Sequence, residues 1–258
     1  MGLDVGLLIS VGTSVPLWTP NNMPSIVQYL DMTVTGPNGK PGGVTESSNL
    51  ISSVPSLKTG ATLTFDEATN KPTLKANALG TLSSIQFAGA QALKSSATIT
   101  LNNFLIVSLV KTSVAGKCLY EHSPIASDPT KAGLYMFPNI AHGMAATRVG
   151  AVFSTYTPNL ALDGTWHIVE HAYNLTHGTH TLTIDGVLQT LTSGVTGNPS
   201  GSYADFWFIG CRNADIALGS PMTGEYLFQS IGTWVDTTDT NLRLLRTYLA
   251  NKASIILP

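Results

Sequence analysis

The run His167-Ile168-Val169-Glu170-His171 holds the residue types that bind zinc and activate a water molecule. Its pattern, H-x-x-E-H, works on a helix, where the two imidazoles lie one turn apart and share a metal. The β-branched residues in the run, the Gly-Thr-Trp sequence before it and the hairpin after it favour a strand. On a strand the two histidines are about 13 Å apart, at ~3.3 Å per residue, too far to share one ion. We therefore predict neither zinc binding nor proteolysis at this motif.

Other reactive side chains are scattered. Cys118 and Cys211 are far apart in the sequence, and neither has a second cysteine at metal-ligand spacing. We expect two free, buried thiols, with a disulfide between two adjoining strands as the alternative. His177 and His180 add imidazoles close to the H-x-x-E-H run, and we expect them on a polar loop and strand face. No serine lies in a G-x-S-x-G turn, which argues against that class of serine nucleophile.

The elements that must position these residues are short strands. From residue 61 onward, runs rich in β-branched and aromatic residues recur between clusters of Gly, Pro, Asn and Asp. The runs are ATLTF, LSSIQFAG, ATITL, NFLIVSLVK, GLYMF, RVGAVFSTY, WHIVEHAY, HTLTI, VLQTL, ADFWFIG and YLFQSIGTWV. Between HTLTI and VLQTL, Asp185-Gly186 supplies the positive φ values of a two-residue type I′ turn. The pattern predicts an all-β sandwich or jelly roll, whereas residues 33–60, rich in Gly, Pro, Ser and Thr, predict a long loop.

One segment, residues 237–252, is typical of a helix. Leu242, Leu245 and Leu249 fall on one face of that helix, with Tyr248 flanking them. Thr238 or Asp239 is available as the N-cap, and Asp236 is expected to act at the same helix start rather than as a metal ligand. Lys252 sits near the negative end of the helix dipole. We predict one short C-terminal helix beside the strands.

Composition excludes several classes of partner. Hydrophobic residues make up 43% of the 258 residues, charged residues only 11%, and the net charge is −2. The 13 Lys and Arg residues form no cluster, so we expect no nucleic-acid partner. No window approaches eighteen apolar residues, so we expect no membrane span. Asp4 interrupts the first apolar run and no basic segment precedes it, which argues against a signal peptide and favours folding in a cytosol.

Several stretches together resemble the concanavalin A-like lectin/glucanase domains, related to laminin-G modules, that are common in bacteriophage structural proteins. They are WTPNNMPSIVQYLDMT (residues 18–33), NKPTLKANALGTLSSIQFAGAQAL (70–93), DGTWHIVEHAYNLTHGTHTLTIDGVL (163–188) and the closing IGTWVDTTDTNLRLLRTYLANKASI. The match covers residues 18–255. Tyr29 replaces a usual Trp, and Ala76-Asn77 replaces Phe-Asp, which removes part of any inherited ligand chemistry. The resemblance implies a concanavalin A-like antiparallel β-sandwich (jelly roll).

Glucanases of this fold carry a Glu-x-Asp-x-Glu run on one strand, where period-two geometry puts all three carboxylates on one face. The glutamates of this sequence are Glu46, Glu67, Glu121, Glu170 and Glu225, and no two lie within five residues of each other. The catalytic strand is therefore absent. A pair from separate strands, such as Glu170 with Asp185, stays as an alternative without support. We predict no enzyme activity, no catalytic residue and no cofactor or metal site.

Tryptophans raise the question of sugar stacking. The resemblance to laminin-G modules implies that Trp166 and His167 pack at the start of a central strand, with a sugar-facing Trp166 as the alternative. Trp207 lies in the apolar run ADFWFIG, which predicts a buried strand rather than an exposed stacking platform. We cannot nominate ligand-binding residues from these patterns.

The first eleven residues alternate strictly between apolar and small or polar residues, the mark of a half-buried strand. We divide the chain into an N-terminal β-strand or arm, residues 1–16, and a jelly-roll domain, residues 17–258. The arm either adds to a neighbour's sheet through backbone hydrogen bonds or is this domain's own first strand.

Together these features predict a non-catalytic bacteriophage virion structural protein: a capsid decoration, spike or fibre-associated subunit assembled in the host cytoplasm. Its expected partners are other virion proteins and itself in a homo-oligomer, with host-surface glycans as a further contact. The alternative is a carbohydrate-binding module or a glycan hydrolase acting on a bacterial surface polysaccharide. Fold alone does not decide between them.

Overall fold

The computed structural model describes residues 18–68, 70–101, 103–113, 117–122, 133–137, 144–148, 155–157, 162–174, 179–193, 203–211 and 221–258. The predicted N-terminal strand, residues 1–16, lies outside this part of the chain. The elements are η1 (Pro20–Asn22), β1 (Ile26–Asp31), β2 (Thr45–Ser47), β3 (Leu50–Pro55), β4 (Thr64–Glu67), β5 (Thr73–Leu79), β6 (Leu82–Ala88), β7 (Leu93–Ser95), β8 (Ile99–Leu101), β9 (Phe104–Lys111), β10 (Tyr120–His122), β11 (Gly133–Phe137), β12 (Met144–Arg148), β13 (Thr155–Thr157), β14 (Trp166–Asn174), β15 (Thr179–Ile184), β16 (Val187–Leu188), β17 (Thr190–Ser193), β18 (Tyr203–Asp205), β19 (Phe208–Ile209), β20 (Thr223–Thr233) and α1 (Thr240–Ala253).

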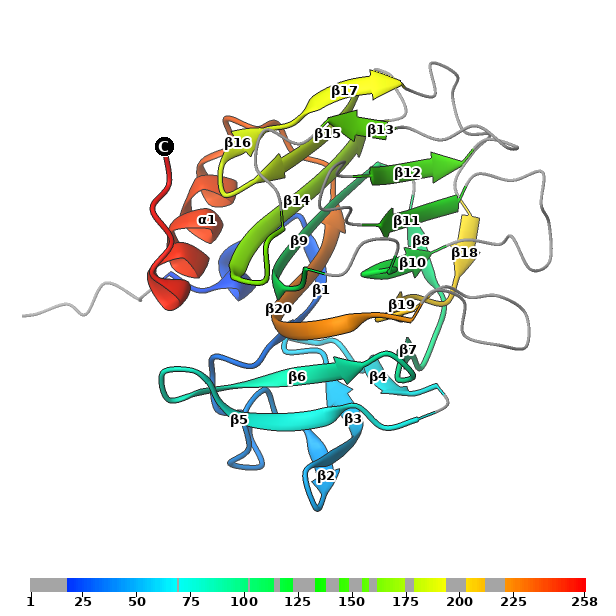
Figure 1. Ribbon diagram of the computed structural model, residues 1–258, viewed down its shortest axis with the longest axis vertical. Coiled ribbons are helices and arrows are strands. Elements are labelled where there is room, and N and C mark those ends of the chain that lie inside the picture. Colours follow the sequence, from blue (N-terminus) through cyan, green and yellow to red (C-terminus); the bar gives the residue numbers. More distant parts are fainter. Residues whose placement is uncertain are drawn as a thin grey trace, which may run out of the picture.

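The main sheet is one antiparallel path that folds back on itself (Figure 1). Its order is β12-β11-β10-β19-β7-β4-β3-β5-β6-β20-β9-β14-β15-β16, with β1 paired to β20 and β2 to β3. The strands from β6 to β16 form one layer, and those from β12 to β7 form the other. The long β20 joins the layer together, because it pairs with β6, β9 and β1.

Side-chain bonds across the interior show that these two layers face each other. The Tyr226 hydroxyl on β20 donates to the carbonyl oxygen of Leu119 at 2.9 Å, just before β10. The Trp207 indole N–H, just before β19, donates to Gln229 of β20 at 3.0 Å. These two buried polar groups therefore each have a partner in the opposite layer, which offsets their loss of hydration.

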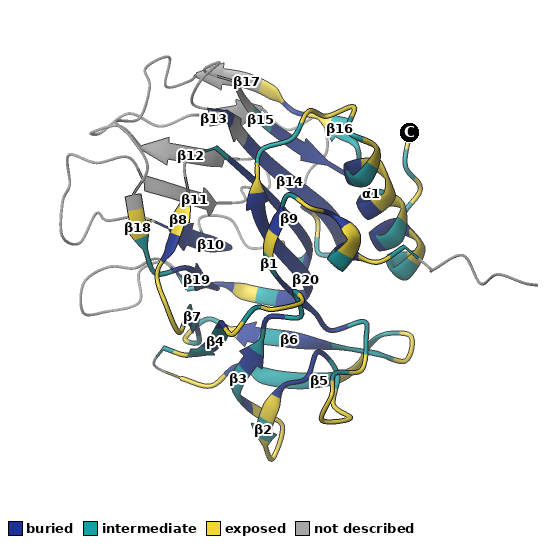
Figure 2. Cartoon of the chain, turned by 180° about the vertical axis from the view of Figure 1, so that it is seen from behind, coloured by how far each residue is buried: buried dark blue, intermediate teal, exposed yellow. Residues whose placement is uncertain are grey.

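The layer of β9, β14 and β20 is covered on both faces, since β10 and β19 lie on one side and α1 on the other (Figures 1 and 2). Seven of the eight residues of β9 are buried, which explains a continuous apolar run where a one-sided strand would alternate. The helix packs its buried Leu242, Leu245 and Leu249 toward this sheet. Its N-cap is Asp239, whose carboxylate accepts from the Leu242 N–H at 3.0 Å.

These features confirm the predicted fold class, an antiparallel β-sandwich with one C-terminal helix. The type I′ hairpin is also confirmed, with φ of 50° at Asp185 and 80° at Gly186. The prediction of a long loop over residues 33–60 is wrong, because β2 and β3 lie inside it and pair. The buried Ile51 and Val54 of β3 are separated by serines, so the run lacks the period-two signal of a strand.

No helix in the described part of the chain is long and apolar enough to cross a membrane.

Candidate functional site

The H-x-x-E-H run lies on β14, so the strand prediction is confirmed. The pleat sends His167 and His171 toward the opposite layer and Glu170 to the side of α1. His171 lies within the core, its Nδ1 2.9 Å from the Tyr120 hydroxyl. Among the described residues no group of three His, Cys, Asp or Glu side chains is placed to hold a metal ion. The run therefore contributes to three separate contacts instead of one site.

On the helix side, Glu170 forms a buried ion pair with Arg246 of α1. The guanidinium donates through Nε to Oε1 and through Nη2 to Oε2, at 2.5 and 2.7 Å. Burial raises the pKa of Glu170, and the hydrogen bonds and charge of Arg246 offset part of that rise. Because both carboxylate oxygens accept an N–H, this geometry belongs to the ionised acid. The pair fixes α1 against β14 and occupies Glu170 fully.

At the start of β14, His167 lies between two carboxylates. Its Nδ1 is 2.7 Å from Asp185 Oδ2, and its Nε2 is 3.2 Å from Asp163 Oδ1. Burial lowers the pKa of His167, but the bonds and charges of Asp185 and Asp163 outweigh it, so the pKa is raised. Since both carboxylates accept, both ring nitrogens donate, and the ring is an imidazolium. The second Asp185 oxygen accepts from the Ile168 N–H at 2.7 Å, which ties the hairpin turn to β14.

Thr165, His167 and Asp185 lie in the order hydroxyl, imidazole and carboxylate, the order of a nucleophilic triad. Thr165 Oγ1 is 3.2 Å from His167 Nε2. The hydrogen bonds nevertheless do not fit a nucleophilic triad, because the Thr165 hydroxyl donates its proton to Asp163 Oδ1 at 2.7 Å and not to the imidazole. The Thr165 hydroxyl and backbone N–H lower the pKa of Asp163 to about 2, with a further contribution from His167. An imidazolium held by two carboxylates cannot accept a proton from the hydroxyl.

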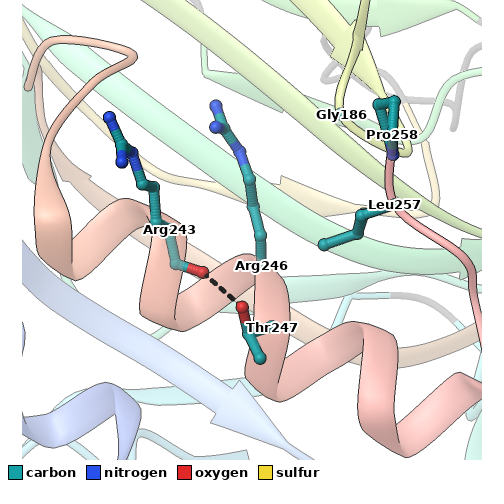
Figure 3. A pocket seen from close by; sticks show the side chains of 6 residues that line it. All are labelled: Gly186, Arg243, Arg246, Thr247, Leu257 and Pro258. Carbon is teal, nitrogen blue, oxygen red and sulfur yellow. Dashed lines mark hydrogen bonds between the residues drawn. The ribbon is translucent and has the colours of Figure 1, made fainter.

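A surface hollow of about 260 Å³ opens beside the Glu170–Arg246 pair. It lies between α1, the hairpin turn and the C-terminal tail, and its lining comprises Gly186, Arg243, Arg246, Thr247, Leu257 and Pro258. Figure 3 shows the Arg243 and Arg246 side chains extending from the helix side by side, with Leu257, Pro258 and Gly186 across from them. The combination of two guanidinium groups with two apolar walls gives this hollow a mixed chemistry suited to a small polar ligand.

Other acids predicted or present near the sheet are also paired. Glu225 accepts from Lys75 at 2.7 Å and from the Ser84 hydroxyl at 2.8 Å. Asp31 accepts from the Tyr248 hydroxyl of α1 at 2.7 Å. Burial raises the pKa of Asp31, and hydrogen bonds from Thr33 and Tyr248 oppose that rise. The two acids of the proposed alternative pair, Glu170 and Asp185, each have their own cation.

The predicted tryptophan and cysteine environments are confirmed. Trp207 is fully buried and Trp166 nearly so, which leaves neither as an exposed stacking platform. Cys118 and Cys211 are free and buried. Cys211 packs with Phe208 in a small cluster apart from the main core, and burial, helped by the Glu121 charge, raises the pKa of its thiol to about 12. His177 lies outside the described residues, and only the backbone of His180 is described.

Sequence reasoning missed Arg243, Arg246 and Asp163 as parts of a site. Arg243 and Arg246 are three residues apart on a predicted helix, so their common face could be predicted, but nothing in the sequence shows which strand that face meets. Asp163 precedes β14 in an Asp-Gly-Thr turn, and this local pattern was a usable signal, because an aspartate there caps the backbone two residues on.

Solved structures share the fold at low sequence identity. A GH54 α-L-arabinofuranosidase aligns with a TM-score of 0.54 and 8% identity over 79% of this chain and 51% of its own. A CBM40 module of a Ruminococcus gnavus sialidase gives a TM-score of 0.48 at 13% identity, over 62% and 95% of the two chains. A pentraxin from Limulus polyphemus gives 0.44 at 12%, over 58% and 76%.

No model of a known protein family matches the sequence, and no curated protein matches it either. The antiparallel path, the two facing layers and the likeness to the GH54 α-L-arabinofuranosidase agree on the architecture. The chain is a β-sandwich of the concanavalin A-like, jelly-roll type.

Proposed function

We propose that this chain is a non-catalytic structural subunit of a bacteriophage virion, a capsid decoration, spike or fibre-associated protein that also contacts host-surface glycans. The phage setting rests on the sequence resemblance described above. The binding and assembly role rests on the paired acids of the sandwich and on the hollow beside α1.

One observation carries the non-catalytic part. Five acids are buried in the described part of the chain, and four of them, Asp31, Glu170, Asp185 and Glu225, each bond to a hydroxyl, an imidazolium, a guanidinium or an ammonium group. A glycosidase needs two carboxyl groups that face one substrate bond, one of them free to give a proton. These four acids stabilise the contacts between strands and between sheet and helix, which is the distribution expected of a scaffold.

The virion role is tested by mass spectrometry of density-purified phage particles from the strain that encodes the chain. We expect the protein in a fixed ratio to the major capsid or tail protein, and retained after a high-salt wash. Its presence in the lysate but not in the particles would overturn the proposal. Native mass spectrometry of the purified protein adds the assembly state, and a trimer supports a spike or fibre.

A free-standing carbohydrate-binding module is the second candidate. The observation that favours it is the hollow beside α1, which offers a guanidinium, a hydroxyl and apolar walls within one small volume. Incubation with acidic and neutral bacterial polysaccharides separates this candidate from a hydrolase. Retention on a polysaccharide without release of reducing ends supports a module, and release of reducing ends supports hydrolysis.

A further inference from the structure

We propose that the hollow beside α1 binds the carboxylate of an acidic sugar, with Arg243 as the residue that recognises it. This inference deepens the glycan contact of the proposed function and rests on it. It names the ligand class as a uronic-acid residue of an acidic polysaccharide and the place as the space between α1, the β15–β16 turn and the tail.

Arg243 differs from its neighbour Arg246 in what its guanidinium touches. Arg246 uses Nε and Nη2 on Glu170, and its Nη1 is 3.4 Å from the Thr237 carbonyl oxygen. The Arg243 side chain is exposed and has no hydrogen bond or ion pair with any residue that the structure describes. Its planar set of N–H donors is therefore open to a ligand, and that set matches a carboxylate with two parallel bonds.

The buried pair next to it prepares this position. Because Glu170 holds Arg246 against the sheet, the second guanidinium stays at the edge of the hollow with its charge largely neutralised. Arg243 extends alongside it in the same direction (Figure 3). A ligand carboxylate on Arg243 would thus meet a second, fixed guanidinium rather than an acid, since the Glu170 oxygens already accept two N–H bonds.

The local charge favours a ligand with one negative charge. The lining residues that the structure describes include no Asp or Glu, and two acids that adjoin them, Glu170 and Asp185, are paired with Arg246 and the His167 imidazolium. Asp163 lies on the other side of that imidazolium. Arg243 also lines the hollow and has no ion pair with any residue that the structure describes. One such charge suits a carboxylate, whereas a phosphate-rich polymer requires several clustered cations.

The walls favour a sugar over a bare anion. Leu257 and Pro258 supply apolar surface on which the C–H face of a pyranose can pack, and the Thr247 oxygen can accept from a sugar hydroxyl. The Thr247 hydrogen is already donated to the Arg243 carbonyl oxygen at 3.0 Å. The volume of about 260 Å³ is below that of drug-sized pockets, about 300–1,000 Å³, so the hollow takes one sugar residue.

The test uses the arginine Nε–Hε signals in two-dimensional NMR of the purified full chain. The sequence contains only Arg148, Arg212, Arg243 and Arg246, and the Arg243 signal is assigned by its loss in Arg243→Gln. We expect methyl β-D-glucuronide to shift this signal with a Kd in the millimolar range. Methyl β-D-glucoside, the neutral match, should leave it unchanged. Calorimetry on an acidic polysaccharide should show binding at least tenfold weaker in Arg243→Gln.

Lys71→Gln is the matched control, because it removes one exposed positive charge that is paired with Glu67, away from α1. It should bind the glucuronide like the unmodified protein. Equal binding of sodium acetate would show a general anion site, and equal binding of N-acetylglutamate amide would indicate an acidic protein partner. Either result, or an Arg243 signal indifferent to glucuronide, overturns the inference. Particle incorporation of Arg243→Gln measures the virion role separately, since assembly without sugar binding leaves the proposed function intact.

Discussion

The two faces of β14 solve the same problem, the burial of polar side chains, in opposite ways. On the face toward the second layer, His171 bonds to the Tyr120 hydroxyl through Nδ1, and the Tyr120 ring stacks on Trp207 with centroids 5.1 Å apart. On the face toward α1, Glu170 and Arg246 form an ion pair. Adjacent residues of one strand therefore enter a largely aromatic core and a charged contact.

This contrast shows where a charge can be buried in this fold. A helix at the sheet surface can bring a long, partly exposed cation to a buried acid, because the Arg246 side chain keeps 16% of its surface in contact with solvent. Between the two layers, His171, Tyr120 and Trp207 use hydrogen bonds and ring stacking instead.

The largest expected effect comes from breaking the charged face. Arg246→Met leaves the Glu170 carboxylate buried without its cation, and we expect the free energy of unfolding to fall by about 3–5 kcal/mol. Urea unfolding followed by tryptophan fluorescence measures it. The double variant Arg246→Met/Glu170→Gln should recover most of the loss. If the single and double variants were equally destabilised, the ion pair would not be what orders this face.

The second prediction concerns the stability of the aromatic core at acidic pH, where the His122 ring stacks on Trp207. His122 Nε2 donates to the Ile99 carbonyl oxygen at 2.6 Å, and burial lowers the pKa of His122 to about 4 from 6.5, despite this bond and one to Asp205. The stability that the neutral ring contributes is complete above pH 6.5 and is lost as pH falls toward 4. The loss is at most about 3 kcal/mol. His122→Asn should flatten the difference in unfolding free energy between pH 6.5 and 4, and an unchanged slope would contradict this.

A smaller effect concerns the start of α1, which carries the charged face. Asp239→Ala removes the N-cap acceptor of the Leu242 N–H, and we expect a loss of about 1 kcal/mol in thermal or urea unfolding. Asp236→Ala is the comparison, because the Asp236 carboxylate accepts from the Thr238 N–H and hydroxyl, ahead of the helix. A larger loss in Asp236→Ala than in Asp239→Ala would show that the turn, not the cap, sets the helix start.

The last and smallest effect concerns His167, whose contribution to stability changes with pH in the opposite direction to that of His122. The pKa of His167 is raised, so the stability from its imidazolium is complete below pH 6.5 and is lost as pH rises through the folded pKa. Asp163→Asn removes one carboxylate, so the His167 imidazole should titrate at lower pH in an NMR titration. Asp236→Asn, which touches no histidine, should leave that titration unchanged. An unaltered His167 titration in Asp163→Asn would contradict the proposed contact between the His167 ring and the Asp163 carboxylate.

Local patterns predicted much of this fold because the responsible interactions lie close in sequence. Asp185-Gly186 needs only its own φ values to make the turn, and Leu242, Leu245 and Leu249 need only helical spacing. The separation of His167 from Glu170 likewise follows from the period of a strand. The strands within residues 33–60 were not predicted from local patterns, because β3 is stabilised by pairing with β2 and β4 and its own sequence lacks a strand pattern.

The site could not be predicted in the same way, because its contacts join distant parts of the chain. Glu170 and Arg246 are 76 residues apart, and no period or motif links them. A charged residue in the middle of an apolar strand was the available signal, since a buried carboxylate requires a cation somewhere in the fold. That signal points to the acid, but it does not show which of the Lys and Arg residues would be its cation.

The pairing of β20 has a consequence for synthesis in the cell. This strand supplies partners to β1, β6 and β9, all of which precede it by more than a hundred residues. Until residues 223–233 have left the ribosome, a nascent chain carries β9 with one open, apolar edge. We therefore expect translation to pass through a long aggregation-prone stage, during which chaperones shield the half-built sheet.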